Sequence, residues 1–257
     1  MNEIKVEPNQ FGGIIIEAES LASNPGEFRR QLKSSIESWR GDGVKVAWLL
    51  LDRHQITLVP VAVEEGFDFH HTESQSLQLT LRLVDGAFIP PFATHYIGAG
   101  GVVLKDDAYL LVVAERYRSR GRRHYKLPGG ALHPGEHIAD AASREILEET
   151  GIKTQFISLN CFRHWHGYRY GKSDIYFVCR LKALTFEITH QEEEIEECLW
   201  MPVDEYLNHP NVHIFNRNVV KAALSGQGIT SIHIDGYGTP ETHEFFMPAD
   251  RQDAKRE

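Results

Sequence analysis

The chain has 257 residues, of which 42% are hydrophobic and 25% charged, an ordinary balance for a globular protein of one large or two small domains. These proportions exclude the disordered, collagen-like and mini-protein classes. A formal net charge of -9 argues against a protein that binds nucleic-acid backbones, because such binding needs a surplus of Lys and Arg.

Cysteine usage and hydropathy indicate the cellular compartment. The three cysteines, Cys161, Cys179 and Cys198, are scattered and form no CxxC pair. This pattern excludes a thioredoxin site or a zinc knuckle and fits a reduced, cytoplasmic compartment. No run approaches the roughly 18 apolar residues of a membrane span, and the first residues lack the features of a secretory signal. We therefore expect a cytoplasmic protein whose partners are neither nucleic acids nor membranes.

Residues 1–90 predict a small α/β domain. Asn24, Pro25 and Glu27 are typical of a helix start, and Gly41 and Gly43 predict its end. The other predicted elements are strands at 14–16, 44–51, 67–71 and 77–84 and a second helix at 55–65.

This N-terminal half shows no metal-ligand cluster and no nucleophile–base pair. His70 and His71 are neighbours on a predicted strand, where adjacent side chains point to opposite faces, so we expect that they do not line one site. We expect a domain without chemistry of its own that docks on the rest of the chain, covers part of a substrate cleft or builds a dimer interface.

The Pro90-Pro91 pair can continue neither a helix nor a strand ladder, so it predicts a domain boundary. The second half then predicts a basic loop, a tight turn at Gly129-Gly130 and a polar tail beyond residue 248. The predicted strands lie at 97–104, 109–114, 156–162, 174–181 and 199–201, and the predicted helices at 138–150 and 216–224. This order favours a sheet with helices on its faces, α/β or α+β rather than doubly wound.

The most informative segment is residues 127–152. Glu145, Glu148 and Glu149 are spaced i, i+3 and i+4, so their carboxylates share one face of the predicted helix. One interpretation is a solvated acidic face. The other is a site for Mg²⁺ or Mn²⁺, which would relieve the repulsion and points to a phosphate-bearing substrate.

The same segment matches the Nudix box, in which Gly130, Glu136 and the run from Arg144 to Ile152 occupy the fixed positions. The chain therefore resembles the Nudix hydrolases, and the resemblance implies an α/β/α sandwich with a mixed sheet. It also implies metal-dependent hydrolysis of a nucleoside diphosphate linked to another moiety.

Motifs outside the box resemble one Nudix subgroup. These motifs lie at residues 66–73, 93–95, 171–174 and 200–203. The subgroup carries a small, acetyltransferase-like α/β pre-Nudix domain and includes plant ADP-ribose/NADH pyrophosphatases and the animal fibroblast-growth-factor-antisense Nudix protein. The implied domains are residues 1–90 (pre-Nudix), 91–230 (Nudix) and 231–257 (a C-terminal extension with a polar tail).

The resemblance assigns roles to the residues of the box. Glu145 and Glu149 would be the principal ligands of Mg²⁺ or Mn²⁺, with Glu148 sharing or bridging a second ion. The Gly130 carbonyl would add a ligand. Glu136 and Arg144 would join the loop to the helix through an ion pair.

Residues around the box supply further candidates. In the acidic run at 192–197, Glu194 is the first choice for a further ligand or general base, and Glu193 the second. The candidate substrate contacts are Arg116 and Arg118 for a diphosphate, Tyr125, and the cluster of Trp165 and Tyr168 with Tyr170 for stacking on adenine. For the aromatic cluster, packing in a core or dimer interface is an equal alternative.

The resemblance to this subgroup implies hydrolysis of ADP-ribose, NADH or both, giving AMP and a phosphorylated product. Many ADP-ribose-specific members of the family carry a proline shortly after the box, and its absence here, with no proline between residues 134 and 202, argues against narrow ADP-ribose specificity. The alternatives are a nucleoside triphosphate, coenzyme A or nucleotide-sugar substrate, or a catalytically idle, ligand-sensing module. The resemblance also allows a homodimer.

Overall fold

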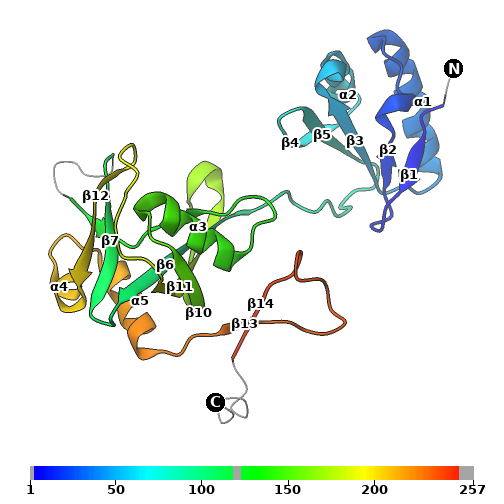
Figure 1. The fold of residues 1–257 in the computed structure, drawn as a ribbon. Coiled ribbons are helices and arrows are strands. Elements are labelled where there is room, and N and C mark those ends of the chain that lie inside the picture. Colours follow the sequence, from blue (N-terminus) through cyan, green and yellow to red (C-terminus); the bar gives the residue numbers. More distant parts are fainter. Residues whose placement is uncertain (1–2, 118–122, 249–257) are drawn as a thin grey trace. The chain divides into compact units, whose positions relative to one another are not determined.

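The fold is that of a computed structural model, which describes residues 3–117 and 123–248. The chain divides into two compact units, Met1–Ala93 and Thr94–Glu257 (Figure 1). The first unit has one hydrophobic core and the second has two. Within the two described ranges, no helix is long and apolar enough to cross a membrane.

The first unit is built on a five-stranded sheet with the order β1-β2-β3-β5-β4. The strands are β1 (Val6–Pro8), β2 (Ile14–Ile16), β3 (Val46–Asp52), β4 (Asp68–Thr72) and β5 (Ser76–Arg82). The pair β2–β3 is parallel and the other pairs are antiparallel. Four of the five strands were predicted from their apolar runs, whereas the three polar-flanked residues of β1 carry no such signal.

Helix α1 (Pro25–Gly41) begins where the sequence predicts. The Asn24 side chain accepts hydrogen bonds from the backbone N–H groups of Gly26 (2.9 Å) and Glu27 (3.2 Å), which satisfies two donors at the helix start. The buried face of α1, with Phe28 and Leu32, packs in one core with the strands.

The predicted helix at 55–65 is divided in two. The unit has two short 3₁₀ helices, η1 (Ala18–Ser20) and η2 (Arg53–Leu58). Helix η2 leads directly into α2 (Val59–Glu64). Pro60 lies in the first turn of α2. Because proline has no backbone N–H and is tolerated only in the first turn, one continuous α-helix across this position is unfavourable.

The expectation that the side chains of His70 and His71 point to opposite faces was wrong. A β-bulge between Phe69 and His71 breaks the alternation of side chains along β4, and the two Nδ1 atoms lie 2.6 Å apart. The Nε2 atom of His70 lies 2.8 Å from the Pro90 carbonyl oxygen, and the ring of His71 stacks on Phe92 at 4.1 Å. The pair therefore fixes the segment that leaves the first unit.

The second unit contains a seven-stranded sheet whose main path is β10-β11-β6-β7-β12, with β8 paired to β7 and β9 to β6. Its strands are β6 (His95–Lys105), β7 (Tyr109–Glu115), β8 (Tyr125–Lys126), β9 (Gly129–Ala131), β10 (Thr154–Trp165), β11 (Ser173–Ala183) and β12 (Ile195–Pro202). The sheet is mixed, because β11 and β6 are parallel and the other pairs antiparallel.

Helices cover both faces of this sheet. The helices are α3 (Ile138–Thr150), α4 (Val203–Asn208) and α5 (Ile214–Ser225), with a short 3₁₀ turn η3 (Arg169–Gly171). One core joins α3 to one face through Ala142 and Ile146, and another joins α4 and α5 to the opposite face through Tyr206 and Val220 (Figure 1). The predicted α/β/α sandwich with a mixed sheet is confirmed.

The predicted Gly129-Gly130 turn is a strand instead. Gly129 and Gly130 belong to β9 and pair with Gly100 and Ala99 of β6. A Cβ atom on Gly100 would lie 2.0 Å from the Tyr176 hydroxyl and 2.6 Å from the Pro128 carbonyl oxygen. Glycines on both strands therefore permit a close backbone approach that larger residues would prevent.

The described part of the C-terminal extension is ordered against α3. It forms a hairpin of β13 (Thr230–Ile232) and β14 (Phe245–Met247). Glu244 accepts hydrogen bonds from the backbone N–H groups of Ile138 (2.7 Å) and Ala139 (3.3 Å), and Phe246 packs into the core under α3. The segment therefore supplies the anion at the start of α3. The polar tail that the sequence predicts lies mainly outside the described residues.

Removing this anion is expected to destabilise the second unit. Glu244→Ala should lower the free energy of unfolding by about 1 kcal/mol, the usual contribution of a helix N-terminal cap. Chemical denaturation measures the change, with Asp235→Ala as the control, since the Asp235 carboxylate is fully exposed. Equal effects of the two substitutions would contradict the capping role of Glu244.

Candidate active site

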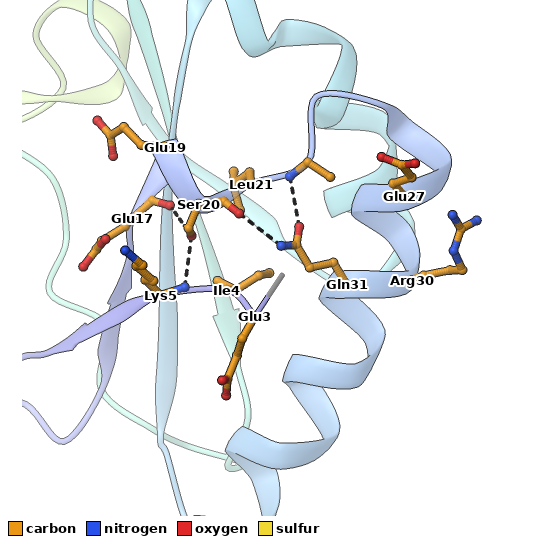
Figure 2. A pocket seen from close by; sticks show the side chains of 11 residues that line it. Glu3, Ile4, Lys5, Glu17, Glu19, Ser20, Leu21, Glu27, Arg30 and Gln31 are labelled. Atoms are coloured by element: carbon orange, nitrogen blue, oxygen red, sulfur yellow. Dashed lines mark hydrogen bonds between the residues drawn. The ribbon is translucent and has the colours of Figure 1, made fainter. Parts of the chain in front are cut away.

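Each unit carries a pocket. The pocket of the first unit has a volume of about 890 Å³ and lies between the segment at residues 17–22 and the start of α1 (Figure 2). Gln31 accepts a hydrogen bond from the Ala22 N–H and donates one to the Ser20 carbonyl, while the Ser20 hydroxyl accepts one from the Lys5 N–H. These polar groups are therefore used in hydrogen bonds within the first unit. We place the candidate site in the other pocket.

The pocket of the second unit has a volume of about 820 Å³, within the usual range for small-molecule sites. Helix α3 contributes Glu145 and Glu149, β9 contributes Gly130, and the residue before β12 is Glu194. The pocket thus brings together carboxylates that are far apart in the sequence, such as Glu145 and Glu194.

Glu149 is the buried carboxylate that α3 contributes to this pocket, with 7% of its surface exposed. One oxygen, Oε2, accepts a hydrogen bond from the Gly129 N–H (2.8 Å), and the other, Oε1, lies 3.3 Å from the Lys126 ammonium. Burial raises the pKa of Glu149, and the charge of Lys126 opposes that rise. The buried charge is therefore accommodated by two specific partners.

Lys126 joins two carboxylates. Its Nζ atom lies 2.7 Å from Glu115 Oε1 as well as 3.3 Å from Glu149 Oε1. Burial acts to lower the pKa of Lys126, but the charges of Glu149 and Glu115 outweigh it and raise that pKa. Lys126 therefore stays positively charged at neutral pH.

Arg144 holds the remaining carboxylates of the box. Its guanidinium makes hydrogen bonds of 2.7 and 2.9 Å with the two oxygens of Glu136, and it donates to the Ala131 carbonyl (3.0 Å). It also contacts Glu145 (2.8 Å) and Glu148 (3.2 Å). The hydrogen bonds from Arg144 hold the pKa of Glu136 at about 2, against an ordinary value of 4.5.

The same pocket is also lined by a cationic and aromatic cluster around Arg163. Arg163 forms an ion pair with Asp174 of the neighbouring strand, and both residues line the pocket. The Arg163 guanidinium lies 5.3 to 5.6 Å from the ring centroids of Trp165, Tyr176 and Phe215. This arrangement offers flat apolar surfaces beside a fixed positive charge, which suits a nucleotide.

The structure brings together six of the residues predicted from the sequence. The predicted residues that line the pocket are Gly130, Glu145, Glu149, Trp165, Tyr168 and Glu194. Within the described lining, Glu148, Glu193, Arg116 and Tyr125 do not occur. The Tyr125 hydroxyl donates to Glu197 (2.6 Å), and Arg116 Nε donates to the Glu192 carbonyl (2.9 Å). Arg118 lies outside the described residues.

Several pocket residues were not recognised in the sequence. They are Tyr96, Glu115, Lys126, Arg163, Arg169, Asp174, Tyr176, His213, Phe215 and Asn216. Lys126 directly precedes the Leu127-Pro128-Gly129-Gly130 run, and Asp174 ends one of the subgroup motifs, so proximity to a motif could have indicated these two. The residues of α5 carry no local signal.

The residues present fit a divalent cation. Two carboxylates, Glu145 and Glu149, and backbone oxygens are the hard ligands that Mg²⁺ and Mn²⁺ prefer. Glu145 lies directly against Gly130, since a Cβ atom there would be 2.3 Å from Glu145 Oε2. In residues 3–117 and 123–248, however, no three His, Cys, Asp or Glu side chains already share a geometry that could hold one ion.

Comparisons with known proteins show the family of the chain. A family model described as "NUDIX domain" matches residues 94–223, and one described as "Nudix hydrolase domain" matches residues 4–83. The chain therefore belongs to the Nudix hydrolase family, and the predicted resemblance, including an N-terminal pre-Nudix domain, is confirmed. Nudix family hydrolases generally use divalent metal ions.

Several relatives match over most of this chain. Nudix hydrolase 2 of Arabidopsis thaliana is 39% identical over 79% of this chain and 74% of its own length. The human protein "Nucleoside diphosphate-linked moiety X motif 6" is 33% identical over 87% of this chain and 73% of its own length. Nudix hydrolase 8 of Arabidopsis thaliana is 37% identical to this chain, which spans only 56% of that relative's length. A solved NUDIX hydrolase from Nitrosomonas europaea matches 52% of this chain and 90% of its own, with 25% identity and a TM-score of 0.45.

The lowered pKa of Glu136 makes stability depend on pH. Ionised Glu136 stabilises the fold above its unfolded pKa of 4.5, and this contribution is lost as the pH falls through about 2. Glu136→Gln should therefore lower the Tm at neutral pH, and the difference from wild type should shrink between pH 4.5 and 2. Thermal unfolding at a series of pH values checks this, with Glu193→Gln as an exposed control. A Tm difference that does not change with pH would contradict it.

Proposed function

We propose that the chain hydrolyses the diphosphate bond of nucleoside diphosphate derivatives, with ADP-ribose and NADH as its substrates and AMP as one product. The observation that carries the proposal is that Glu145, Glu149 and Gly130 line the same pocket as Trp165 and Tyr168. Candidate metal-binding carboxylates and aromatic surfaces for a nucleobase are thus available to one ligand in this pocket.

Glu145 and Glu149 would hold Mg²⁺ or Mn²⁺, with Glu148 and the Gly130 carbonyl as further ligands. When bound, the cation supplies charge neutralisation for the diphosphate and lowers the pKa of a coordinated water. Glu194 lines the same pocket and accepts the proton of the attacking water. Attack on one phosphorus breaks the P–O–P bond and releases AMP and a phosphorylated product such as ribose 5-phosphate.

The cationic and aromatic cluster around Arg163 would bind the rest of the substrate. Trp165 and Tyr168 stack on a base, and Arg163, fixed by Asp174, carries a positive charge for the phosphates. The name of the human relative, which refers to a nucleoside diphosphate-linked moiety, supports this substrate class.

The domain roles are part of the same proposal. Residues 91–230 would perform the reaction, residues 1–90 would do no chemistry, and the extension at 231–257 would support α3. The polar pairing within the N-terminal pocket supports this division. The acetyltransferase-like character of the N-terminal domain, a homodimer and a cytoplasmic location stay predictions from the sequence.

A substrate panel tests the proposed specificity. ADP-ribose, NADH, a nucleoside triphosphate, coenzyme A and a nucleotide sugar are incubated with the protein and Mg²⁺, and the products are identified by chromatography. Release of AMP from ADP-ribose or NADH with the highest kcat/KM supports the proposal. A higher kcat/KM on another substrate would overturn the specificity, and binding without any product would overturn the hydrolase.

Removing one metal-binding carboxylate should abolish most of the activity. We expect Glu149→Gln to lower kcat with the best substrate by about 10²-fold or more, because a catalytic metal contributes several kcal/mol to the transition state. Steady-state kinetics with Mg²⁺ present measure this, and Glu187→Gln, in the loop before β12, is the control. Near-wild-type turnover by Glu149→Gln would exclude α3 as the metal site.

Loss of a stacking surface should weaken substrate binding more than turnover. Trp165→Ala should raise KM about tenfold with little change in kcat, since stacking of a base on an aromatic ring contributes roughly 1–3 kcal/mol. Tyr170→Ala is the matched control, because Tyr170 is a neighbouring aromatic residue that is 89% exposed and absent from the described lining. Equal KM changes in the two variants would contradict a specific role for Trp165.

A further inference from the structure

Lys126 is a half-buried cation that lies between two carboxylates of this pocket. It lies on β8 directly before the loop that leads to Gly129 and Gly130, and its side chain is only 22% exposed. Its ammonium lies between Glu115 of β7 and Glu149 of α3. A protein cation therefore already contacts the buried carboxylate of the metal-binding helix.

Both oxygens of Glu149 are engaged by the protein. Oε1 faces the Lys126 ammonium at 3.3 Å, and Oε2 accepts the Gly129 N–H at 2.8 Å. A divalent ion that binds either oxygen would repel a cation held at the same carboxylate. The backbone N–H of Gly129 belongs to a strand paired with β6 and cannot withdraw without breaking that pairing. The partner that can move is the ammonium, at the end of a flexible four-carbon chain.

The two contacts of Lys126 differ in length. The distance to Glu115 (2.7 Å) is shorter than the distance to Glu149 (3.3 Å). Lys126 can therefore leave Glu149 and keep an anionic partner, so its own charge does not become unpaired. Arg144, by contrast, is held by a two-oxygen contact with Glu136 and by the Ala131 carbonyl.

Burial explains why some cation is required beside Glu149. An ionised carboxylate that is 7% exposed is costly without a partner charge. Lys126 supplies that charge in the protein described here, and a divalent ion would supply a larger one at the same oxygen.

We propose that Lys126 is an internal counter-cation that holds Glu149 in place of the divalent ion and is displaced from it when the ion binds. The inference rests on the proposed metal site at Glu145 and Glu149. Lys126 thus competes with the metal and sets its affinity, and the displaced ammonium remains in the pocket beside Glu115.

Metal affinity measured without substrate tests this competition. Mn²⁺ binding to the full chain is titrated by electron paramagnetic resonance for wild type, Lys126→Met, Lys126→Arg and Glu149→Gln. Lys126→Met should bind Mn²⁺ about tenfold more tightly or better. A cation this close to a carboxylate lowers its proton affinity by roughly one to three decades, and we expect an effect of that order on its affinity for Mn²⁺. Lys126→Arg keeps the charge and should bind like wild type.

A charge-matched control separates the local effect from net charge. Lys182→Met removes one positive charge from an exposed position at the far end of β11 from Asp174 and should leave the Mn²⁺ affinity unchanged. Unchanged or weaker Mn²⁺ binding by a folded Lys126→Met would overturn the inference, as would equally tightened binding in Lys182→Met.

Chemical labelling of the wild type keeps the test valid if Lys126→Met does not fold. The protein is acetylated with limiting acetic anhydride, with and without Mn²⁺, and each lysine is quantified by mass spectrometry. Labelling of Lys126 should increase with Mn²⁺, while labelling of Lys33, 59% exposed in the first unit, should not change. Protection of Lys126 by Mn²⁺ would overturn the inference.

The outcomes distinguish this inference from the function on which it rests. If wild type binds Mn²⁺ and Glu149→Gln does not, yet Lys126→Met binds like wild type, the metal site stands and the competition is overturned. If wild type and Glu149→Gln bind Mn²⁺ equally weakly, both the metal site and the competition are overturned.

Discussion

The burial of one carboxylate, that of Glu149, is the constraint on which the rest of the pocket depends. An ionised group between a helix and a sheet is stable only where the surrounding chain supplies donors and opposite charge. Gly129 and Lys126 supply them here. The Gly129 N–H can reach Glu149 because β9 lies close against β6, and the glycines of β6, with Gly100 the tightest, permit that approach.

Segments far apart in the sequence hold α3 at both ends. At its start, Glu244, more than one hundred positions away in the sequence, accepts hydrogen bonds from two backbone N–H groups. Within the helix, Arg144 forms an ion pair with Glu136 of the preceding loop. At its end, Gly151 adopts a left-handed conformation with its N–H on the Leu147 carbonyl. The carboxylates of α3 therefore project from a helix whose position is determined by tertiary contacts.

The first unit contrasts with the second in how it uses its polar groups. In its pocket, Gln31 and Ser20 hold neighbouring backbone segments in place, and His70 and His71 hold the chain at Pro90 and Phe92. In the second unit, by contrast, carboxylates, two arginines and a lysine line one pocket. This difference is the physical basis for assigning the chemistry to the second unit alone.

The sequence alone determined the features that depend on local pattern. The cap at Asn24, the bounds of α3, the spacing of Glu145 and Glu149, the sandwich and the Nudix family all follow from residues close together in the chain. Only the tertiary structure decided that the Gly129-Gly130 pair is a strand, that Lys126 pairs with Glu149, that Arg163 pairs with Asp174 and that Glu244 caps α3. These contacts join residues 11 to 106 positions apart, and no periodicity of 2 or 3.6 residues encodes a pairing at such separations.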